Sequence, residues 1–211
     1  MKQPRRLGLE KSATRDRIVA AAVKVLQQEG GIGLTASAVA RVANVKPHLI
    51  HYYFRTMDDL LVAMVEIIGR EGLEKTEAAL GSEEPLRALW TAETGSTWGN
   101  LMLQIQAIAM HRDSVRKALV AHAEDVRRLQ IEAVVRHCAA HQIVTDIPPV
   151  AMIQVIVGIA RQLVRERTLG FTLGHEVVVS VIENLLEQAA TRAGDSTTTD
   201  LPTDRKFSQS M

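Results

Sequence analysis

The stretch TASAVARVANVKPHLIHYYFRTMDDLL, residues 35–61, decides the fold, because it reads as two short helices joined by a tight turn. Thr35 can cap the first of these helices by accepting a backbone N–H bond. The buried stripe of that helix is Ala38, Val39 and Val42. Asn44 tolerates the positive φ of a turn, and Pro47 fits the first turn of the next helix, where its missing N–H costs nothing. This spacing predicts a helix-turn-helix, whose second helix enters the major groove of DNA.

Helical periodicity continues on both sides of this stretch, and no segment alternates like a half-buried strand. A preceding helix is expected from Thr14 to about Gln28, where glycines stop it, and Asp58 and Asp59 open a fourth helix at the positive end of its dipole. The further helices are expected over residues 57–80, 85–111 with an interruption near Gly95 and Gly99, 113–141 as one helix or two, 149–169 and 175–193. We therefore predict an all-α protein of about nine helices, with a three-helix head and a larger helical body.

The net charge differs between the predicted head and the predicted body. Residues 1–57 hold ten basic and three acidic side chains, a net charge of +7, although the whole chain carries only +1. The remainder therefore carries −6. A basic head on an acidic body indicates a nucleic-acid-binding module attached to a part that avoids nucleic acid, although lopsided charge also occurs in proteins that bind no DNA.

Composition limits the environment of the protein. Aromatic residues make up only 3% of the chain, which predicts an aliphatic core of packed helices. Cys138 is the only cysteine, so no internal disulfide can form and a reducing cytoplasm is expected. The N-terminal MKQPRRLGLEK lacks the apolar run of a secretory signal, and the apolar segment 150–164 is too short to span a membrane. We expect a cytoplasmic protein without a membrane segment.

The head resembles the TetR family of transcriptional regulators. The resemblance rests on residues 39–45 (VARVANV) at the turn, on residues 49–54 (LIHYYF) in the recognition helix and on residues 59–61 (DLL) after it, and it extends over roughly residues 14–64. The HYYF ending is similar to that of choline-responsive repressors. The chain departs from the usual pattern at Asn44, Leu49, His51 and Met57, which puts the operator sequence in doubt, and Arg55 can supply the phosphate-binding charge that Met57 lacks.

The resemblance implies a dimer that binds a palindromic double-stranded DNA operator. The expected DNA contacts come from the second helix, the recognition helix and the residue after it: Thr35, Ser37, Lys46, Pro47, His48, His51, Tyr52, Tyr53 and Arg55. Lys46 can donate to guanine, and Thr35 and Tyr53 suit phosphate oxygens. Ile50 and Phe54 are expected in the core of the head. The basic arm with Arg5, Arg6 and Lys11 can follow the minor groove or the backbone. For the His and Tyr side chains, packing against the body is the alternative.

For the body, the resemblance implies a small-molecule inducer and a dimer interface. The expected lining of the inducer site mixes apolar bulk with isolated polar groups: Trp90, Thr94, Trp98, Met102, Ile105, Gln106, Gln130, Val134 and Cys138. Such a mixture suits a small, mostly apolar ligand, while ordinary core packing explains each residue singly. A homodimer is expected through the last two helices. Their apolar residues are Ile153, Ile156, Val157, Ala160 and Val164, then Val178, Val181, Ile182, Leu185 and Ala189. The same stripes can also pack within one subunit.

The predicted division of the chain is a flexible basic arm (1–13), a helix-turn-helix domain (14–57), a ligand-binding and dimerisation domain (58–193) and a disordered tail (194–211). His137 and His141 share a helix face as two zinc ligands do, but no third ligand is nearby, so we predict no metal site and no cofactor. No catalytic motif occurs, and nearby arginines such as Arg136, Arg165 and Arg167 can pair with Glu132 and Glu166. We therefore expect a ligand-released repressor rather than an enzyme. The alternative is a DNA-binding or architectural protein without a ligand.

Overall fold

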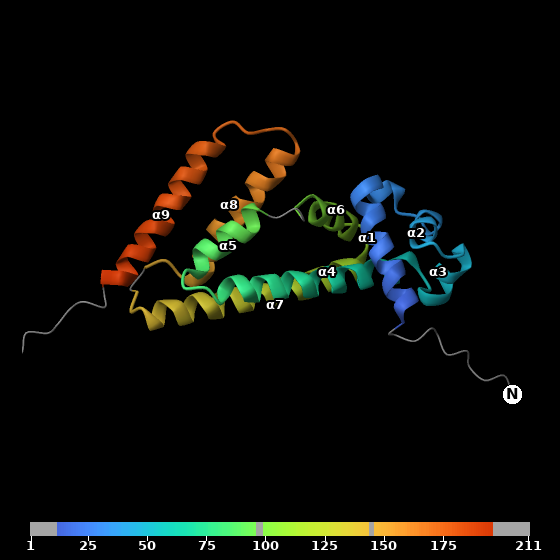
Figure 1. Ribbon diagram of the computed structural model, residues 1–211, viewed down its shortest axis with the longest axis horizontal. Coiled ribbons are helices and arrows are strands. Elements are labelled where there is room, and N and C mark those ends of the chain that lie inside the picture. The colour runs from blue at the N-terminus through green and yellow to red at the C-terminus, as the bar shows by residue number, and fades with distance from the viewer. Residues whose placement is uncertain (1–11, 96–98, 144–145, 196–211) are drawn as a thin grey trace, which may run out of the picture.

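The computed structural model describes residues 12–95, 99–143 and 146–195, with only the backbone described for 188–195. Over these ranges the chain folds into nine α-helices and no strand (Figure 1). They are α1 (Ala13–Gly33), α2 (Ala36–Ala43), α3 (Pro47–Tyr53), α4 (Met57–Leu80), α5 (Pro85–Thr94), α6 (Gly99–Ala109), α7 (Asp113–Ala140), α8 (Pro149–Thr168) and α9 (His175–Asp195). The prediction of an all-α protein of about nine helices is confirmed. None of the described helices is both long enough and apolar enough to cross a membrane.

The first helix of the head begins two residues earlier than predicted. The Ser12 hydroxyl, not that of Thr14, caps α1 by accepting a bond from the backbone N–H of Arg15 at 3.1 Å. Gly30 breaks the helix with a φ of 73°, as the glycine cluster predicts, yet helical turns resume and reach Gly33 rather than ending at about Gln28. The reason is that Gly30 alone takes the left-handed backbone, so the following glycines can turn helically again.

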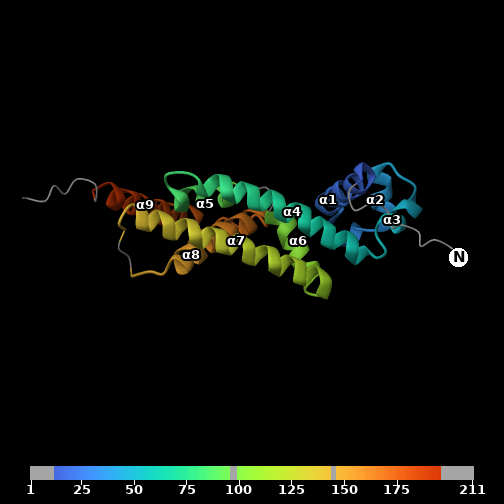
Figure 2. The same cartoon turned by 90° about the horizontal axis from the view of Figure 1, so that it is seen from below.

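Two long helices connect the head to the body. The Thr56 hydroxyl and the Asp59 carboxylate form a reciprocal capping box at the start of α4, which fixes the point where the chain leaves the head. From there α4 runs alongside α7 through the body, and Figures 1 and 2 show the two helices side by side. The segment 113–141, predicted as one helix or two, forms the single helix α7.

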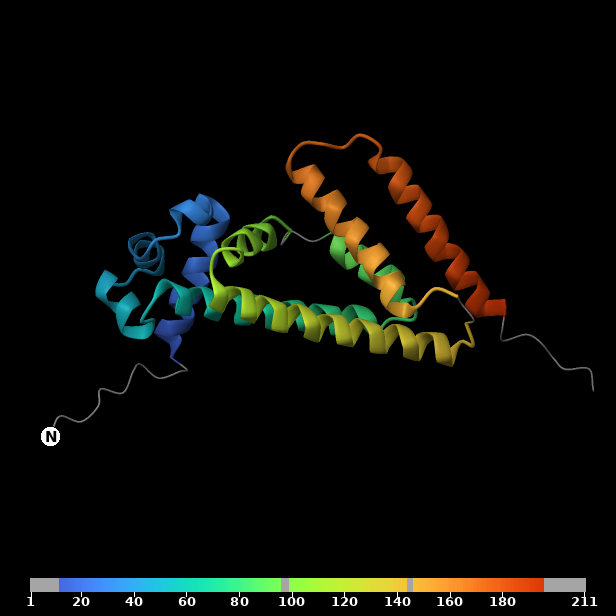
Figure 3. The ribbon, with the colours of Figure 1, turned by 180° about the vertical axis from the view of Figure 1, so that it is seen from behind.

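The other helices complete the body. The predicted interruption near Gly95 and Gly99 is present and separates α5 from α6. α5 packs on α8, whereas α6 lies between α1 of the head and the helices α7 and α8. Figure 3 shows α8 and α9 at the end of the molecule away from the head. α9 includes Gly194 and Asp195, which the predicted tail contained, and the rest of that tail and the arm residues 1–11 lie outside the described residues.

One apolar cluster joins the head to the nearest part of the body. Its buried members come from all three head helices and from α4, α6 and the start of α7, with Ile18, Ile50, Leu60, Ile105 and Val115 among them. Two smaller clusters hold the far end together around Trp90 and Val134. The predicted domain boundary after Met57 therefore lies in the first turn of α4, inside a shared core, so a movement of α4 or α6 changes the packing of the head.

Candidate DNA interface and ligand cavity

The turn between α2 and α3 has the geometry that the sequence predicts. Asn44 ends α2 in the left-handed conformation, with φ 52° and ψ 51°. The backbone N–H of Val45 donates to the Ala40 carbonyl at 3.0 Å, which closes the turn. Lys46 has extended backbone and precedes Pro47, the first residue of α3. α2 is amphipathic and buries Val39, Ala40 and Ala43, so its packing in the core fixes the position of the turn and of α3.

The outer face of α3 is free for a partner within the part of the chain described. Lys46, Pro47, His48, His51 and Tyr52 are all exposed, and Tyr52 is 48% exposed. Packing of these His and Tyr side chains against the body, the alternative given above, is therefore not what the structure shows. Ile50 and Phe54 are buried, as predicted. α3 thus presents one polar and aromatic face and anchors itself with the other.

Tyr53 differs from the other predicted DNA contacts. Its side chain is half-buried and packs against the core of the head, and its ring meets the Tyr52 ring edge-on with centroids 5.1 Å apart. The sequence left two roles open for Tyr53, contact with a DNA phosphate and packing inside the protein. Its half-buried position is compatible with part of each role. Its contact with the core supports Tyr52 on the exposed face.

The remaining predicted contacts flank α3. Thr35, Ser37 and Arg55 are all exposed. The Thr35 hydroxyl accepts a bond from the Ala38 N–H at 3.2 Å, the predicted cap of α2, and its own proton stays available to a phosphate oxygen. Arg55 lies in the short link Phe54–Thr56, between the end of α3 and the Thr56 cap of α4.

A contact that the sequence analysis missed ties α1 to the recognition helix. The Arg15 guanidinium lies 5.0 Å from the centre of the Phe54 ring, within the range of a cation–π interaction. Arg15 counted above only as part of the positive charge of the head. Its partner is 39 positions away in sequence, so no local pattern could have indicated the pair.

The body contains a cavity of about 400 Å³ that is lined by α4, α5, α6, α7 and α8 and is partly open to solvent. This volume falls within the range of small-molecule sites. The apolar part of its lining includes Ile68, Met102, Leu103, Leu119, Val126 and Val164. Ile68 of α4 lines the cavity and belongs to the apolar cluster of the head, and Met102 of α6 and Leu119 of α7 line the cavity and pack against that cluster, so three helices connect the cavity to the head.

The polar part of the lining is more highly charged than the sequence analysis expected. Its ionisable side chains, apart from His122, are Glu71, Lys75, Glu93, Arg127, Arg161 and Arg165. Arg161 and Glu93 form a two-pronged ion pair, with nitrogen–oxygen distances of 2.8 and 3.0 Å. Burial lowers the pKa of Arg127, and the neighbouring positive charge of Arg161 lowers it further, against the opposite effect of Glu93. Cations outnumber carboxylates along this wall.

Two buried nitrogen donors at the cavity have no hydrogen-bond partner among the described residues. They are Nε of Arg127 and Nε2 of Gln130. Gln130 is only 1% exposed, and it lies one helical turn from Arg127 on α7, so the two donors share a face. A buried donor without an acceptor costs roughly 1–3 kcal/mol. An acceptor group bound in the cavity would therefore satisfy two donors that are otherwise without a hydrogen bond.

His122 lines the same cavity where α7 crosses α4. A Cβ on Gly69 would lie only 2.7 Å from its Nδ1, so the imidazole ring occupies the space that a side chain at position 69 would need. Burial lowers the pKa of His122, although Asp125 acts in the opposite direction. The close approach of α4 and α7 thus depends on a glycine against a histidine ring.

The predicted inducer-binding residues divide into three groups. Met102, Gln106 and Gln130 line the cavity. Trp90, Ile105 and Val134 are instead buried in the apolar clusters, Thr94 donates its hydroxyl to the Trp90 carbonyl, and Cys138 packs half-buried beside Val134. Trp98 lies outside the described residues. Helical periodicity placed these side chains on inward faces, but it could not distinguish the faces that meet a core from those that meet a cavity.

Sequence reasoning missed Arg127, Arg161 and Lys75, which the structure places on the cavity wall. A signal was available for two of them. Arg161 interrupts the apolar run of α8, and Arg127 lies three positions before Gln130 on α7. A charge within an otherwise inward-facing stripe is costly to bury unless it faces a cavity or a partner.

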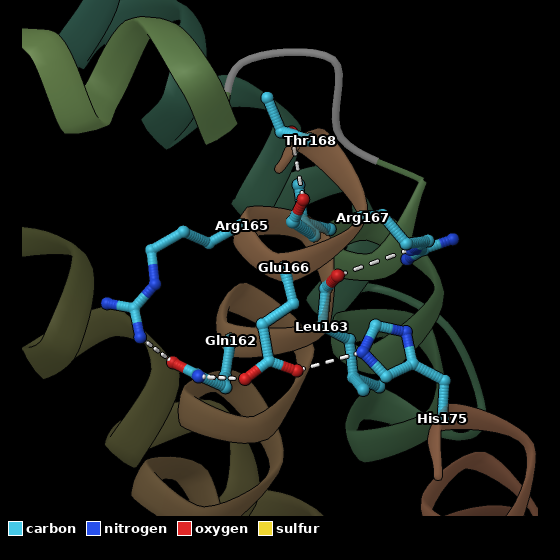
Figure 4. A network of polar contacts seen from close by, with 8 residues as sticks. Gln162, Leu163, Arg165, Glu166, Arg167, Thr168 and His175 are labelled. Carbon is cyan, nitrogen blue, oxygen red and sulfur yellow. Dashed lines mark hydrogen bonds and ion pairs between the residues drawn. The ribbon is translucent and has the colours of Figure 1, made fainter. Parts of the chain in front are cut away.

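The polar network at the end of α8 also differs from expectation. Glu166 accepts hydrogen bonds from Gln162 and from His175 of α9, rather than pairing with Arg165 or Arg167 as predicted (Figure 4). Arg167 instead donates to the carbonyls of Leu163 and Thr94. The predicted pair of Glu132 with Arg136 is present at 3.9 Å. The network links a helix that lines the cavity to the helix expected at the dimer interface.

His137 and His141 are close, with ring centroids 4.5 Å apart. Burial and the neighbouring His141 lower the pKa of His137. Over the described ranges, no group of three or more His, Cys, Asp or Glu side chains is arranged to hold a metal ion.

Comparison with known proteins connects this geometry to a family. Residues 18–64 match the family model described as bacterial regulatory proteins, tetR family. The chain is 29% identical over 135 residues to the HTH-type transcriptional regulator BetI of Rhizobium meliloti (strain 1021), covering 58% of this chain and 64% of that protein. It is 32% identical over 82 residues to BetI of Brucella anthropi, covering 39% and 42% respectively. The matches thus span less than two thirds of either relative.

Solved structures agree on the fold over a longer range. E. coli NemR in its reduced form aligns with a TM-score of 0.69 at 19% identity, covering 81% of this chain and 96% of that one. A transcriptional regulator from Saccharomonospora viridis in complex with choline aligns with a TM-score of 0.67 at 15% identity, covering 76% and 88%. At these identities the likeness shows the fold alone.

Proposed function

This chain belongs to the TetR family of bacterial regulatory proteins, and from that premise we propose that it is a cytoplasmic, sequence-specific DNA-binding repressor whose operator affinity is controlled by a small molecule. The observation that carries the proposal is the face of α3. A tight turn and a buried anchor hold Lys46, His48, His51 and Tyr52 outward on one short helix, as a recognition helix requires.

Specificity and affinity come from different side chains of this face. Lys46, His48 and His51, at the start and on the outer side of α3, are placed to meet base edges. Thr35, Ser37, Tyr53 and Arg55 surround them and suit phosphate oxygens, which orient the head without reading sequence. The excess of basic residues in the head adds a long-range attraction to DNA that weakens with salt.

Binding-site selection with the purified protein tests this function. The expected result is a palindrome with two half-sites spaced for two heads. Lys46→Ala and His51→Ala should each weaken binding to that site by roughly 5- to 150-fold, the range for loss of a base contact. Lys117→Ala and His111→Ala are matched controls on exposed positions of the body and should leave binding unchanged. Selection of no sequence, or equal binding by all four variants, would contradict the proposal.

A palindromic site requires a dimer, which we place at α8 and α9. Among the described residues of α9, Val178, Val181 and Leu185 form an exposed apolar row, and Val181 and Leu185 are 52% and 55% exposed. The predicted α8 residues Ile153, Ile156, Val157 and Ala160 are buried within the subunit, and Val164 lines the cavity, so α8 would contribute through exposed Val155 instead. Exposed apolar rows of this kind mark contact surfaces.

Sedimentation of charged variants tests this interface. Val181→Lys and Leu185→Lys should shift the protein from dimer to monomer, because each would bury an unpaired ammonium group in the contact. Val120→Lys is the matched control, since Val120 is equally exposed, at 49%, but lies on α7. Dimers that persist in both α9 variants would move the interface elsewhere.

The cavity supports the ligand-responsive form of this function over an architectural DNA binder, for which a filled body is expected. A ligand that binds one arrangement of α4 and α6 more tightly than another shifts the equilibrium between them. Both helices share the core of the head, so the shift changes the spacing of the two recognition helices. The choline of the structural neighbour fits this cavity poorly, because the described lining has more cations than carboxylates and no Phe, Tyr or Trp to cover a quaternary ammonium.

A further inference from the structure

We propose that the ligand of the body cavity is a small carboxylic acid with an apolar portion, and that its carboxylate accepts hydrogen bonds from Arg127 and Gln130 on α7. This inference rests on the proposed role of the cavity as the inducer site, and it adds the chemical class of the inducer. The protein requires a hydrogen-bond acceptor at this point, because both side chains have buried donors that no described residue satisfies.

Gln130 is the stronger of the two observations. Nearly all buried side-chain polar atoms in folded proteins have a partner, so a 1% exposed amide with an unpaired Nε2 needs a specific explanation. Its neighbours on the same helix face are cavity residues, Val126 and Arg127. An acceptor entering the cavity would satisfy this amide and the Arg127 Nε from one side.

The charge balance selects an anion over a neutral acceptor. Arg161 is neutralised by Glu93, which holds it with two hydrogen bonds. Arg127 lies close enough to Arg161 to be affected by its charge, yet no carboxylate of the described residues lies within ion-pair distance of Arg127. One guanidinium charge is therefore left over at the point where the unsatisfied donors gather. A carboxylate supplies both the charge and two acceptor oxygens, and its planar shape matches the guanidinium.

Apolar lining residues on other helices explain the apolar portion of the ligand. Ile68, Met102 and Leu103 from α4 and α6 face the same space as the two donors on α7. An anion held by α7 with an apolar group against α4 and α6 would therefore contact the helices that share the core of the head. A bare inorganic anion would fill the polar part of the cavity only.

Thermal unfolding of the full chain with matched ligands tests the proposal. The probes are sodium butanoate, hexanoate, octanoate and benzoate, each compared with its primary amide and its primary amine at equal ionic strength. At least one acid is expected to raise Tm, while its amide and amine raise it less or not at all. Arg127→Met and Gln130→Leu should weaken the binding of that acid by roughly 10- to 100-fold, the loss expected for a hydrogen bond to a charged group.

The control and the contrary outcomes are specific. Arg128→Met removes a neighbouring guanidinium that pairs with Asp125 on the outside of α7, and it should bind the acid within about twofold of the unmodified protein. If Arg127→Met does not fold, Arg127→Lys takes its place. The proposal is overturned if no acid raises Tm, if an amide or amine binds as tightly as its acid, or if both cavity variants bind the acid normally.

DNA binding without ligand separates this inference from the proposed function. If the selected operator binds the unmodified protein, Arg127→Met and Gln130→Leu alike, and no acid binds the unmodified protein, the regulator stands and only the carboxylate is wrong. If no DNA is selected while an acid binds in the expected manner, the cavity chemistry stands and the proposed function is wrong.

Discussion

His175, the first residue of α9, places its Nε2 2.8 Å from the Glu166 carboxylate in the last turns of α8. Gln162, one turn earlier on α8, donates to the same carboxylate and also lines the cavity. Figure 4 shows the three side chains in sequence, from the helix of the cavity to the helix that carries the exposed apolar row. The orientation of α9 is therefore set by a polar contact at its first residue as well as by its buried Ile182 and Leu186.

Glu166→Gln should reduce the free energy of unfolding at neutral pH. The hydrogen bonds from His175 and Gln162 hold the pKa of Glu166 below its ordinary value of 4.5, so the ionised carboxylate stabilises the fold above that pH. This contribution is lost as the pH falls through the lowered pKa of the folded state. In urea titrations, the difference between Glu166→Gln and the unmodified protein should therefore shrink below pH 4.5. Glu183→Gln, an exposed change on α9, should show no such difference at any pH.

His122→Gln should flatten the decline of stability under mildly acidic conditions. Burial lowers the pKa of His122 from 6.5, so below that pH the unfolded chain takes up a proton more readily than the folded one. The stability associated with the neutral imidazole is present above pH 6.5 and is lost as the pH falls. Asp125, which acts on this ring, remains in the variant, and so do the charged groups that line the same cavity: Glu71, Lys75, Glu93, Arg127, Arg161 and Arg165. An unchanged slope in urea titrations from pH 7 to pH 5 would contradict the assignment.

Gly69→Ala should destabilise the protein by about 1–3 kcal/mol, because its Cβ would meet the rigid His122 ring at 2.7 Å and push α4 from α7. Gly158→Ala is the matched control on α8, where no heavy atom lies within 4 Å of the added carbon, and it should gain up to about 1 kcal/mol from helix propensity. Adding His122→Ala to Gly69→Ala should restore much of the loss. Equal urea midpoints for the two single variants would show that α4 and α7 are not closely packed here.

Asn44→Val should cost about 1–2 kcal/mol, since a β-branched residue cannot readily hold a φ of 52°. Asn44→Gly should keep the midpoint close to that of the unmodified protein, because glycine takes this conformation freely. Thermal unfolding of both variants checks the pair. If Asn44→Gly lost operator binding while keeping its Tm, Asn44 would have a direct role at the DNA rather than a conformational one.

The sequence by itself determined the head. Caps, a turn residue with positive φ and a helix-starting proline act within a few positions of one another, so Thr35, Asn44 and Pro47 could be assigned from local physics, and the face of α3 followed from its period. The same local signals placed the ends of α4 and the break between α5 and α6. The two ends of α1 were predicted wrongly: Ser12 and Thr14 both satisfy the rule for a cap, and the helix resumes after Gly30 and reaches Gly33.

The tertiary structure alone decided which inward faces of the body enclose a cavity. An apolar stripe predicts that a side chain is buried, but not whether it packs in the core or lines a cavity. The sequence pattern is therefore the same for Trp90 and Val134, which are in the core, and for Met102, which lines the cavity. The pairs Arg15 with Phe54 and Glu93 with Arg161 join residues distant in sequence, and no local pattern encodes their distance. The buried donors of Arg127 and Gln130 could be recognised as unsatisfied only from the tertiary structure, because it shows that no neighbouring residue supplies an acceptor.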